Sequence, residues 1–392
     1  MDRVKRIILM LDHSRAAERG LIRGITEYAH SRGSWAFYRY SPRFRTPPFT
    51  HSPTDNIFDR LHKLDADGII GYLPAEKKLV AAILQRKFPA ICLPIQAPID
   101  GMVNIHEDPA VGALGAEHFL EKGLENFAFC PTNDHWSRVR RNGFAQKIHE
   151  AGFTTRIYPL SRERKRIDLE LNRMADWLKT LPKPVGIMAS NDERAAELIQ
   201  ASHLADLRVP DEVSILGVDD DEMICGLSNP PLSSIRLNFE HVGYLAARNI
   251  EDLIARRTPS HPELTLQATG VTTRLSTDIL AITDAEVADA VRFIHRNARR
   301  YLDVHDVVNH SNLSIRALQR RFRLTLGRGI NDVIHRARVR EFAHLLLHTN
   351  LTVYQIAHEL EFNDVAHTSR LFKKETGKTP AQYRRALAPT SH

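Results

Sequence analysis

Residues 303–322 read DVHDVVNHSNLSIRALQRRF, and two helical patterns lie within this stretch. A short pattern around residues 304–308 is followed by a polar turn at residues 310–312. Ser314 then stands where an N-cap is expected, and a second helix is predicted from there to about Leu324. Two helices joined by a tight polar turn are typical of a helix-turn-helix unit.

The same order recurs in residues 351–372, which read LTVYQIAHELEFNDVAHTSRLF. Thr352 and Gln355 have the spacing of a capping box, in which each side chain satisfies the other residue's backbone N–H at the start of a helix. After a turn, Asn363 or Asp364 is predicted to cap a second helix. The tail of the chain therefore contains two successive helix-turn-helix units.

The second helix of each unit has an apolar side and a basic side. Leu318 and Phe322 share the apolar side of the first, and Val365 and Phe372 share that of the other. The opposite sides carry the side chains that we predict to contact DNA: Arg316, Gln319, Arg320, Arg323, His367, Arg370 and Lys374. A single arginine on a helix is as often merely solvated as functional, but a repeated cap, turn and basic face is much harder to explain as surface charge.

One uninterrupted helical pattern joins the two units over residues 331–349, with Val339, Phe342, Ala343 and Leu346 on one side. At 1.5 Å per residue this helix would be about 28 Å long. Successive major-groove faces on one side of B-DNA lie about 34 Å apart. A rigid helix of this length would let one chain present both units to adjacent turns of the groove.

These residues resemble the AraC/XylS family, whose second unit ends in a run such as F-K-K-x-x-G-x-x-P-x-x-Y-R. Residues 372–384 of this chain read FKKETGKTPAQYR. The resemblance covers about 100 residues and implies that the two basic faces enter the DNA groove. Two positions depart from the family pattern. Glu361 replaces a turn glycine, where a left-handed backbone would cost about 1 kcal/mol, and Thr368 replaces an aromatic residue, so either could weaken the second unit.

The net charge of +7 is concentrated in this tail. Residues 285–392 hold 18 Lys and Arg against 10 Asp and Glu, whereas the preceding 284 residues hold 36 against 37. Phosphate neutralisation supplies most non-specific affinity for nucleic acid. The distribution therefore points to a polyanion as the partner of the tail.

The preceding part of the chain alternates short apolar runs with longer amphipathic ones, which is typical of parallel sheet covered by helices on both faces. Seven runs are predicted as buried strands: 6–11, 68–73, 90–95, 126–131, 156–160, 185–190 and 213–218. In such sheets, ligands bind beyond the carboxyl ends of the strands.

Polar side chains follow several of these strands. Carboxylate and amide oxygens accept hydrogen bonds from hydroxyl groups, a guanidinium donates them, and an indole packs on the apolar face of a sugar ring. We therefore predict a sugar-binding cleft that includes Asp12, His13, Trp136, Arg140, Asn191 and Asp219. The structural alternatives are a core role for Trp136 and a capping role for the aspartates, and Asp220 and Asp221 are predicted as caps.

Residues 213–220, VSILGVDD, and residues 230–235, PPLSSI, resemble the effector-binding domain of the LacI/GalR family and of periplasmic sugar-binding proteins. The resemblance implies a two-lobed α/β fold of periplasmic-binding-protein type I, with Asp219, Arg140 and Asn191 as ligand contacts. The DNA-binding unit that precedes this domain in the LacI family is not recognisable here, which leaves DNA recognition to the tail. We divide the chain into a sensor at residues 1–275, a linker at 276–284 and an all-α DNA-binding domain at 285–392.

Other classes of protein are disfavoured. The chain has no apolar run near the 20 residues of a membrane helix and no signal peptide, so a cytoplasmic location is expected. The three cysteines are widely spaced, the histidines lack metal-ligand spacing, and the nucleophile-elbow, zinc-protease, phosphate-loop and dinucleotide motifs are missing, so no cofactor, metal or catalytic residue is predicted. The alternative from another class is a DNA-targeted enzyme or repair protein that uses Cys130.

A known bacterial sugar-operon regulator joins the two halves in this order, and the resemblance to it extends over the whole chain. It implies a homodimeric activator of pentose catabolic genes that binds double-stranded operator DNA, contacts RNA polymerase and responds to a small sugar, D-xylose. A different small effector is the alternative. Closure of the two lobes around the sugar would change the spacing or freedom of the two basic tails.

Overall fold

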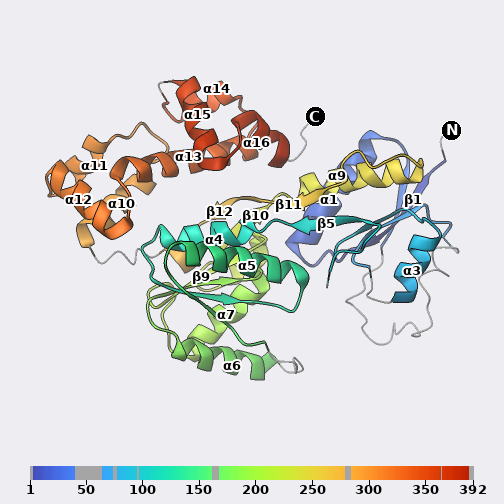
Figure 1. The fold of residues 1–392 in the computed structure, drawn as a ribbon, viewed down its shortest axis with the longest axis horizontal. Coiled ribbons are helices and arrows are strands. Elements are labelled where there is room, and N and C mark those ends of the chain that lie inside the picture. Colours follow the sequence, from blue (N-terminus) through green and yellow to red (C-terminus); the bar gives the residue numbers. More distant parts are fainter. Residues whose placement is uncertain are drawn as a thin grey trace.

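The structure is a computed structural model. It describes residues 3–39, 64–73, 77–94, 97–160, 167–278, 284–362 and 364–387. Two α/β lobes lie side by side, and an all-helical region lies along them (Figure 1). This arrangement confirms the predicted two-lobed sensor followed by helix-turn-helix units. Below, residues up to 278 are called the sensor and residues 284–387 the reader.

The first lobe is built on a six-stranded, all-parallel sheet. Its strands lie in the order β11 (Leu264–Leu266), β5 (Val103–Glu107), β4 (Ala90–Cys92), β3 (Gly68–Gly71), β1 (Lys5–Met10) and β2 (Trp35–Arg39). Alternate residues of β1 point to opposite faces. Ile7 and Leu9 pack in the same core as residues of α1 (Ala16–Ser31) and α9 (Phe239–Ile254), whereas Ile8 and Met10 pack with Ile83 of α3 (Lys77–Gln85).

The second lobe holds the other six-stranded sheet, in the order β12 (Ala268–Thr272), β10 (Ser233–Leu237), β9 (Val213–Val218), β8 (Val185–Ala189), β6 (Asn126–Cys130) and β7 (Thr155–Ile157). Its strands are parallel except for β12, which is antiparallel to β10. The helices of this lobe are α4 (Ala110–Leu120), α5 (His135–Glu150), α6 (Ile167–Thr180), α7 (Asp192–Leu204) and α8 (Glu222–Leu227). All seven predicted strands are present, while β2, β5, β10, β11 and β12 were not foreseen.

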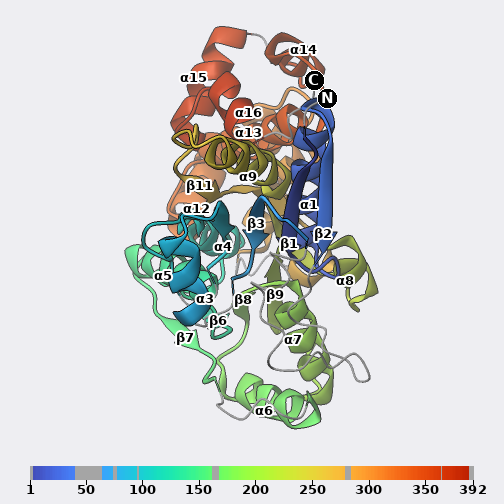
Figure 2. The ribbon, with the colours of Figure 1, turned by 90° about the vertical axis from the view of Figure 1, so that its right-hand side faces the viewer.

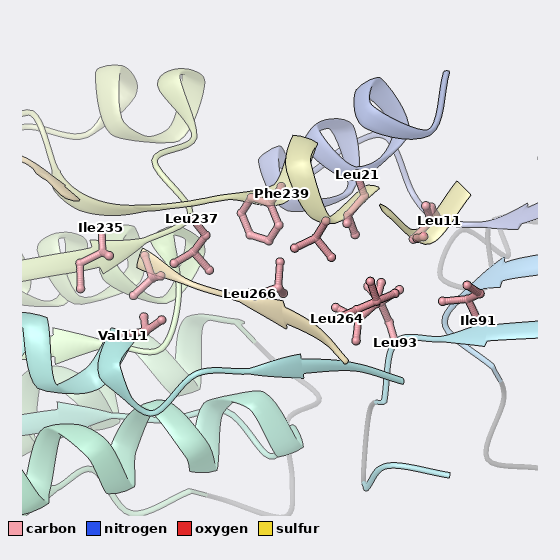
Figure 3. Close-up of a cluster of buried hydrophobic side chains, with 14 of the residues drawn as sticks. Leu11, Leu21, Ile91, Leu93, Val111, Ile235, Leu237, Phe239, Leu264 and Leu266 are labelled. Carbon is pink, nitrogen blue, oxygen red and sulfur yellow. The ribbon is translucent and has the colours of Figure 1, made fainter. Parts of the chain in front are cut away.

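The chain crosses three times between the lobes, and these crossings form the hinge. They run from β5 to α4, from β10 to α9 and from β11 to β12. Phe239, Leu237 and Leu266 at the crossings are buried together in one apolar cluster that continues into both lobes (Figure 3). The lobes therefore share one apolar core at the hinge.

Helices α4 and α5 approach so closely that only glycine fits at their contact. A Cβ atom at Gly112 would lie 1.9 Å from the carbonyl oxygen of Arg140, and one at Gly143 would lie 2.0 Å from that of Pro109. Backbone-to-backbone contact of this kind leaves no side chain to adjust. It holds the backbone of Arg140, a predicted ligand contact, at a set position.

The sensor continues into the predicted linker. Ser276 and Thr277 are fully buried in the second lobe, where the Ser276 hydroxyl donates to the carbonyl of Ile215 at 2.7 Å and accepts from the backbone N–H of Ser233 at 2.8 Å. A segment that completes the hydrogen bonds of buried strands belongs to the domain it packs in. Residues 279–283 of the predicted linker lie outside the described residues.

The reader consists of α10 (Ala285–Asn297), α11 (Val304–His310), α12 (Ile315–Leu326), α13 (Ile330–His348), α14 (Val353–Glu359), α15 (Val365–Thr376) and α16 (Pro380–Leu387). The predicted caps are confirmed: Ser314 accepts from Ala317 N, Asp364 caps α15, and Thr352 and Gln355 form the capping box. Asn363, the alternative cap, lies outside the described residues.

Helix α13 packs in the hydrophobic cores of both halves of the reader. Its first part contributes Val333 and Ile334 to the core of the first unit, and its second part contributes Phe342 and Leu346 to the core of the second. The 19-residue helix is the one predicted from the sequence and spans about 28 Å. Figure 2 shows the reader stacked along one side of the sensor, close to α9.

No helix among these described residues is long and apolar enough to cross a membrane.

Candidate functional site

A cleft lies between the two lobes at the hinge and encloses about 620 Å³, part of it open to solvent. The first lobe contributes mainly apolar side chains and the second lobe mainly polar ones. The lining residues are Arg15, Ala17, Leu21, Tyr72, Leu93, Pro94, Ile105, Glu107, His135, Trp136, Arg140, Asn191, Asp219, Phe239 and Leu266. Four of the six residues predicted to bind a ligand, Trp136, Arg140, Asn191 and Asp219, are therefore brought together.

Arg140 is the best-held polar side chain in the cleft. Its Nε donates to Glu107 Oε1 at 2.6 Å and its Nη1 to the carbonyl oxygen of Ser190 at 2.6 Å, while Asp219 Oδ1 lies 3.4 Å from both terminal nitrogens. The Trp136 ring lies against the guanidinium, with its centroid 4.8 Å away. Burial alone would lower the pKa of Arg140, but the two carboxylates outweigh it and raise the pKa. Arg140 is thus a fixed cation.

Asp219 follows β9 with a φ of 108°, and its backbone N–H donates to Ile235 O at 2.9 Å. Burial raises the pKa of its carboxyl group to about 7, since the attraction of Arg140 is partly offset by the negative charges of Glu193 and Glu107. Arg140 is more tightly bound to Glu107 than to Asp219. Asp219 therefore keeps hydrogen-bonding capacity that a ligand hydroxyl group can use, as acceptor or as donor near neutral pH.

Asn191 and Trp136 lie at the starts of two helices. Asn191 caps α7 by accepting from Arg194 N at 3.1 Å, and its amide group donates to Glu193. Trp136 lies in the first turn of α5 and faces the cleft instead of the core. Asn191 combines the structural role of a cap with a place on the cleft wall.

Asp12 and His13 are not among the residues that line this cleft. The Asp12 carboxylate is buried and accepts from Ser14 N at 3.2 Å, so it is used to close the turn after β1. The His13 ring points outward, is 64% exposed and lies 3.1 Å from an Arg39 nitrogen. The turn at residues 12–14 thus uses the Asp12 carboxylate, while His13 lines an adjoining hollow that shares Asp219 with the cleft.

Two charged residues of the cleft were not singled out from the sequence. Glu107 ends β5, a strand too short and too polar to be recognised, and burial raises the pKa of its carboxyl group against the opposing effect of Arg140. Arg15 comes from the first lobe and pairs with Glu193 of the second at 2.8 Å. Both residues are recognised only by their position next to the cleft in the folded protein, because no local sequence pattern indicates it.

The aspartates that follow Asp219 have different roles. Asp221 caps α8, as predicted, by accepting from Met223 N at 3.1 Å, and its other oxygen accepts from Ala16 N and from Arg19 of the first lobe. Asp220 was predicted as a cap, but its carboxylate instead accepts from Arg274 at 2.8 Å and from Thr272 Oγ1 at 2.6 Å. Two sets of contacts therefore join the lobes: Asp221 with Arg19 and Ala16, and Arg15 with Glu193.

The alternative of a Cys130 enzyme is wrong. The side chain of Cys130 is fully buried at the end of β6, and burial raises the pKa of its thiol to about 12. The thiolate is the reactive form, so a thiol in this state is a poor nucleophile at neutral pH. Cys130 is a core residue and is not among the residues that line the cleft.

The reader displays the predicted DNA contacts at its surface. The four positions on α12 and the three on α15 are all exposed: Arg316, Gln319, Arg320, Arg323, His367, Arg370 and Lys374. Leu318, Phe322 and Phe372 are fully buried on the opposite sides. At the turn of the second unit Glu361 has a φ of 53°, the left-handed conformation expected there, and Thr368 is buried as the sequence implied.

Comparison with known proteins matches the same two parts of the chain. Residues 116–277 match a periplasmic binding protein-like domain, and residues 307–386 match a helix-turn-helix domain. Together with the cleft and the two exposed basic helices, these matches define the class: a DNA-binding transcription regulator with a sensor of the sugar-binding-protein type, and not an enzyme.

Relatives match over most of the chain. The xylose operon regulatory protein of Haemophilus influenzae is 30% identical over 283 residues, covering 71% of this chain and 73% of its own. That of Escherichia coli K12 is 26% identical over 396 residues, covering 97% and 96%. The structure of a xylose-binding transcription activator, XylR, superposes with a TM-score of 0.59 at 24% identity over 99% of both chains. The chain belongs to the family of xylose operon regulatory proteins.

Proposed function

We propose that this protein is a transcription activator of pentose catabolic genes whose interlobe cleft binds D-xylose. The observation that carries the proposal is Arg140, a buried cation fixed by Glu107 and Ser190 against the Trp136 ring in a cleft between two hinged lobes. The relatives named above regulate xylose operons.

The chemistry of the cleft suits a small cyclic sugar. On the second-lobe side Arg140 donates hydrogen bonds, while Asp219 and Asn191 offer oxygens to hydroxyl groups. On the first-lobe side Leu93, Phe239 and other apolar side chains offer a surface for the C–H groups of the ring. Contacts from both lobes mean that a bound sugar favours the closed arrangement, which is the differential binding that a ligand-driven switch needs.

The two basic helices are proposed to read double-stranded DNA in adjacent major-groove segments. Their seven exposed polar side chains are the proposed contacts, and α13 sets the distance between the two units. We further propose that the protein acts in the cytoplasm as a homodimer, with RNA polymerase as a partner at the promoter. A dimer would place four such helices on one operator.

Calorimetric titration with D-xylose tests the sensor. Wild-type protein should bind D-xylose saturably and more tightly than D-ribose, L-arabinose and D-glucose. Asp219→Asn should weaken binding by about 10-fold or more, because a carboxylate accepts hydrogen bonds about twice as strongly as an amide in a buried site. Asp206→Asn is the matched control, since Asp206 also has a positive φ, of 56°, but is exposed in the turn after α7. Equal loss in both variants, or no binding of any pentose, would reject a pentose cleft.

A DNA-binding assay tests the reader separately. The probe is a duplex selected from a random library by the full-length wild-type protein. Arg320→Ala and Arg370→Ala should each weaken binding to it by about 5- to 100-fold if they contact bases, with loss of preference at one base pair. Arg296→Ala, an exposed arginine on α10, is the control. Unchanged affinity in both test variants would show that α12 and α15 are not the reading helices.

A further inference from the structure

The side chain and backbone of Gln267 tie the three hinge crossings together. Its backbone N–H donates to Asn238 Oδ1 at 2.7 Å, and its carbonyl accepts from Asn238 N at 3.1 Å, which joins the β11–β12 and β10–α9 crossings. Its Nε2 donates to Asp108 Oδ2 at 3.2 Å, which adds the β5–α4 crossing. Gln267 therefore lies in one of the three crossings between the lobes and is hydrogen-bonded to the other two.

The remaining polar atom of the same side chain contacts the reader. Gln267 Oε1 accepts from Lys378 Nζ at 3.2 Å, in a half-buried contact. Lys378 lies in the turn between α15 and α16, and its carbonyl accepts from Thr376 Oγ1 at 3.1 Å. Thr376 is the last residue of α15, the second DNA-reading helix. The hinge is thus two side-chain hydrogen bonds away from that helix.

The same residue is next to the ligand cleft. Leu266, which precedes Gln267, lines the cleft, and so does Glu107, which precedes Asp108. Glu107 is bound to Arg140, the proposed centre of sugar recognition. A change in the angle between the lobes would therefore alter the positions of Asp108 and Asn238, the two hinge residues to which Gln267 is hydrogen-bonded.

The reader is also attached at a second place, of a different kind. Glu121, at the end of α4 in the second lobe, accepts from Arg340 of α13. This attachment involves one lobe only, so lobe rotation leaves it in place. The first attachment sits on the hinge itself. With one end held on the second lobe and the other on the hinge, the reader can sense the angle between the lobes.

We propose that Gln267 is the positioning residue through which lobe closure is transmitted to the second helix-turn-helix unit, by way of its hydrogen bond with Lys378. The inference rests on the proposed function, because lobe closure is taken to follow sugar binding. Two discrete arrangements of the Gln267 amide, with and without the Lys378 contact, would supply the two-state element that coupling between distant sites requires.

Hydrogen–deuterium exchange on the full-length protein, with and without saturating D-xylose, tests the proposal. In the wild type, D-xylose should slow exchange in the peptides of the cleft and change it in residues 376–387. Gln267→Met preserves the length of the side chain but removes both of its hydrogen bonds. It should retain the response of the cleft peptides and reduce the response of residues 376–387 by about fivefold, the factor expected for one hydrogen bond.

Matched variants separate the contact from general effects. Lys378→Met should reduce the response of residues 376–387 as Gln267→Met does, and the double variant should reduce it no further, because both remove one shared interaction. Lys373→Met, at an exposed lysine of α15, and Gln146→Met, at an exposed glutamine of α5, should behave as wild type.

Each outcome decides a different point. Two results would overturn the hinge contact as the route without contradicting the sugar cleft. One is an unchanged response of residues 376–387 in Gln267→Met. The other is a wild type in which D-xylose protects the cleft peptides but leaves residues 376–387 unaffected. Absence of protection in the cleft itself overturns the proposed function, and the hinge proposal with it.

Discussion

Replacing Glu121 by Gln should loosen the docking of the reader on the sensor. The Glu121 carboxylate is 16% exposed and lies among three guanidinium groups: it accepts from Arg340 and lies 3.6 Å from Arg336 and 3.9 Å from Arg328. All three arginines come from the reader, whereas Glu121 belongs to the sensor. The change to Gln keeps the shape of the side chain and removes the negative charge that the sensor places among these three arginines.

The size of the effect follows from the burial of the pair. A charged hydrogen bond contributes about 1.5–3 kcal/mol, and exposed ion pairs contribute less than about 1 kcal/mol. Arg340 is 37% exposed and Gln can still accept its hydrogen bond, so the loss should fall between these values, at about 1–2 kcal/mol. The fraction of undocked protein should rise about 5- to 30-fold. The increase should be smaller in high salt, because salt screens the attraction between Glu121 and the three arginines.

Single-molecule fluorescence energy transfer can measure this fraction. Dyes on cysteines introduced at the exposed residues Asn142 and Asn312 would report on the sensor and the reader, and the native cysteines are buried. Glu125→Gln, at an exposed position just before β6, is the control. Equal transfer distributions in wild type and Glu121→Gln at low salt would refute the argument that this cluster holds the two parts together.

The docking of the reader on the sensor should also weaken at low pH in the wild type but not in Glu121→Gln. Burial opposes ionisation of Glu121, but Arg340 and the neighbouring positive charges outweigh it and lower the pKa of the carboxyl group below its ordinary 4.5. A lowered pKa in the docked state means that the stabilisation is present above about pH 4.5 and is lost as the pH falls through the lowered pKa. Glu121→Gln should show no such acid-dependent loss.

Three further predictions concern single residues. Asp219→Asn should raise the melting temperature above pH 7 but not near pH 4. Burial raises the pKa of Asp219 to about 7 in the folded state, so between about pH 4 and 7 the carboxyl group ionises in the unfolded state only, which favours unfolding; calorimetric scans across this range would show no pH-dependent gain if the reasoning is wrong. Gly143→Ala should destabilise the sensor by about 3 kcal/mol or more in urea unfolding, since the added Cβ would lie 2.0 Å from Pro109 O, and a loss below about 1 kcal/mol would show that α4 and α5 can separate freely. Glu361→Gly should be more stable than Glu361→Ala by about 1 kcal/mol in the same assay, because both lose the contact with Tyr301 N but only glycine relieves the φ of 53°; equal stability would contradict the assigned strain.

The local structure of the reader was predictable because its signals are local. Ser314 caps a helix whose third residue, Ala317, lies three positions away, and Thr352 and Gln355 satisfy each other's backbone N–H groups within one turn. The left-handed backbone at Glu361 also follows from its place at a helix end. Such features depend on bonds between residues a few positions apart, so a sequence pattern contains nearly all the information that forms them.

The cleft was only partly predictable. Trp136, Arg140, Asn191 and Asp219 each follow a buried strand, and parallel strands bring their carboxyl ends to one edge of a sheet. The same rule placed Asp12 and His13 there, but the rule gives the end of the strand and not the direction of the side chain. Neither lines the cleft: Asp12 is used within its turn, where it accepts from the backbone of Ser14, and His13 lines the adjoining hollow.

The sequence alone thus determined the class of each domain, the course of its helices and the residues with the chemistry to bind a sugar or DNA. The tertiary structure decided which of those residues meet: Glu107 with Arg140 across 33 positions, Arg15 with Glu193 across the lobes, and Gln267 with Lys378 across 111 positions. Contacts of this kind depend on how two lobes and a reader are packed against one another. No periodicity or spacing encodes that packing, because each partner's local pattern is complete without the other.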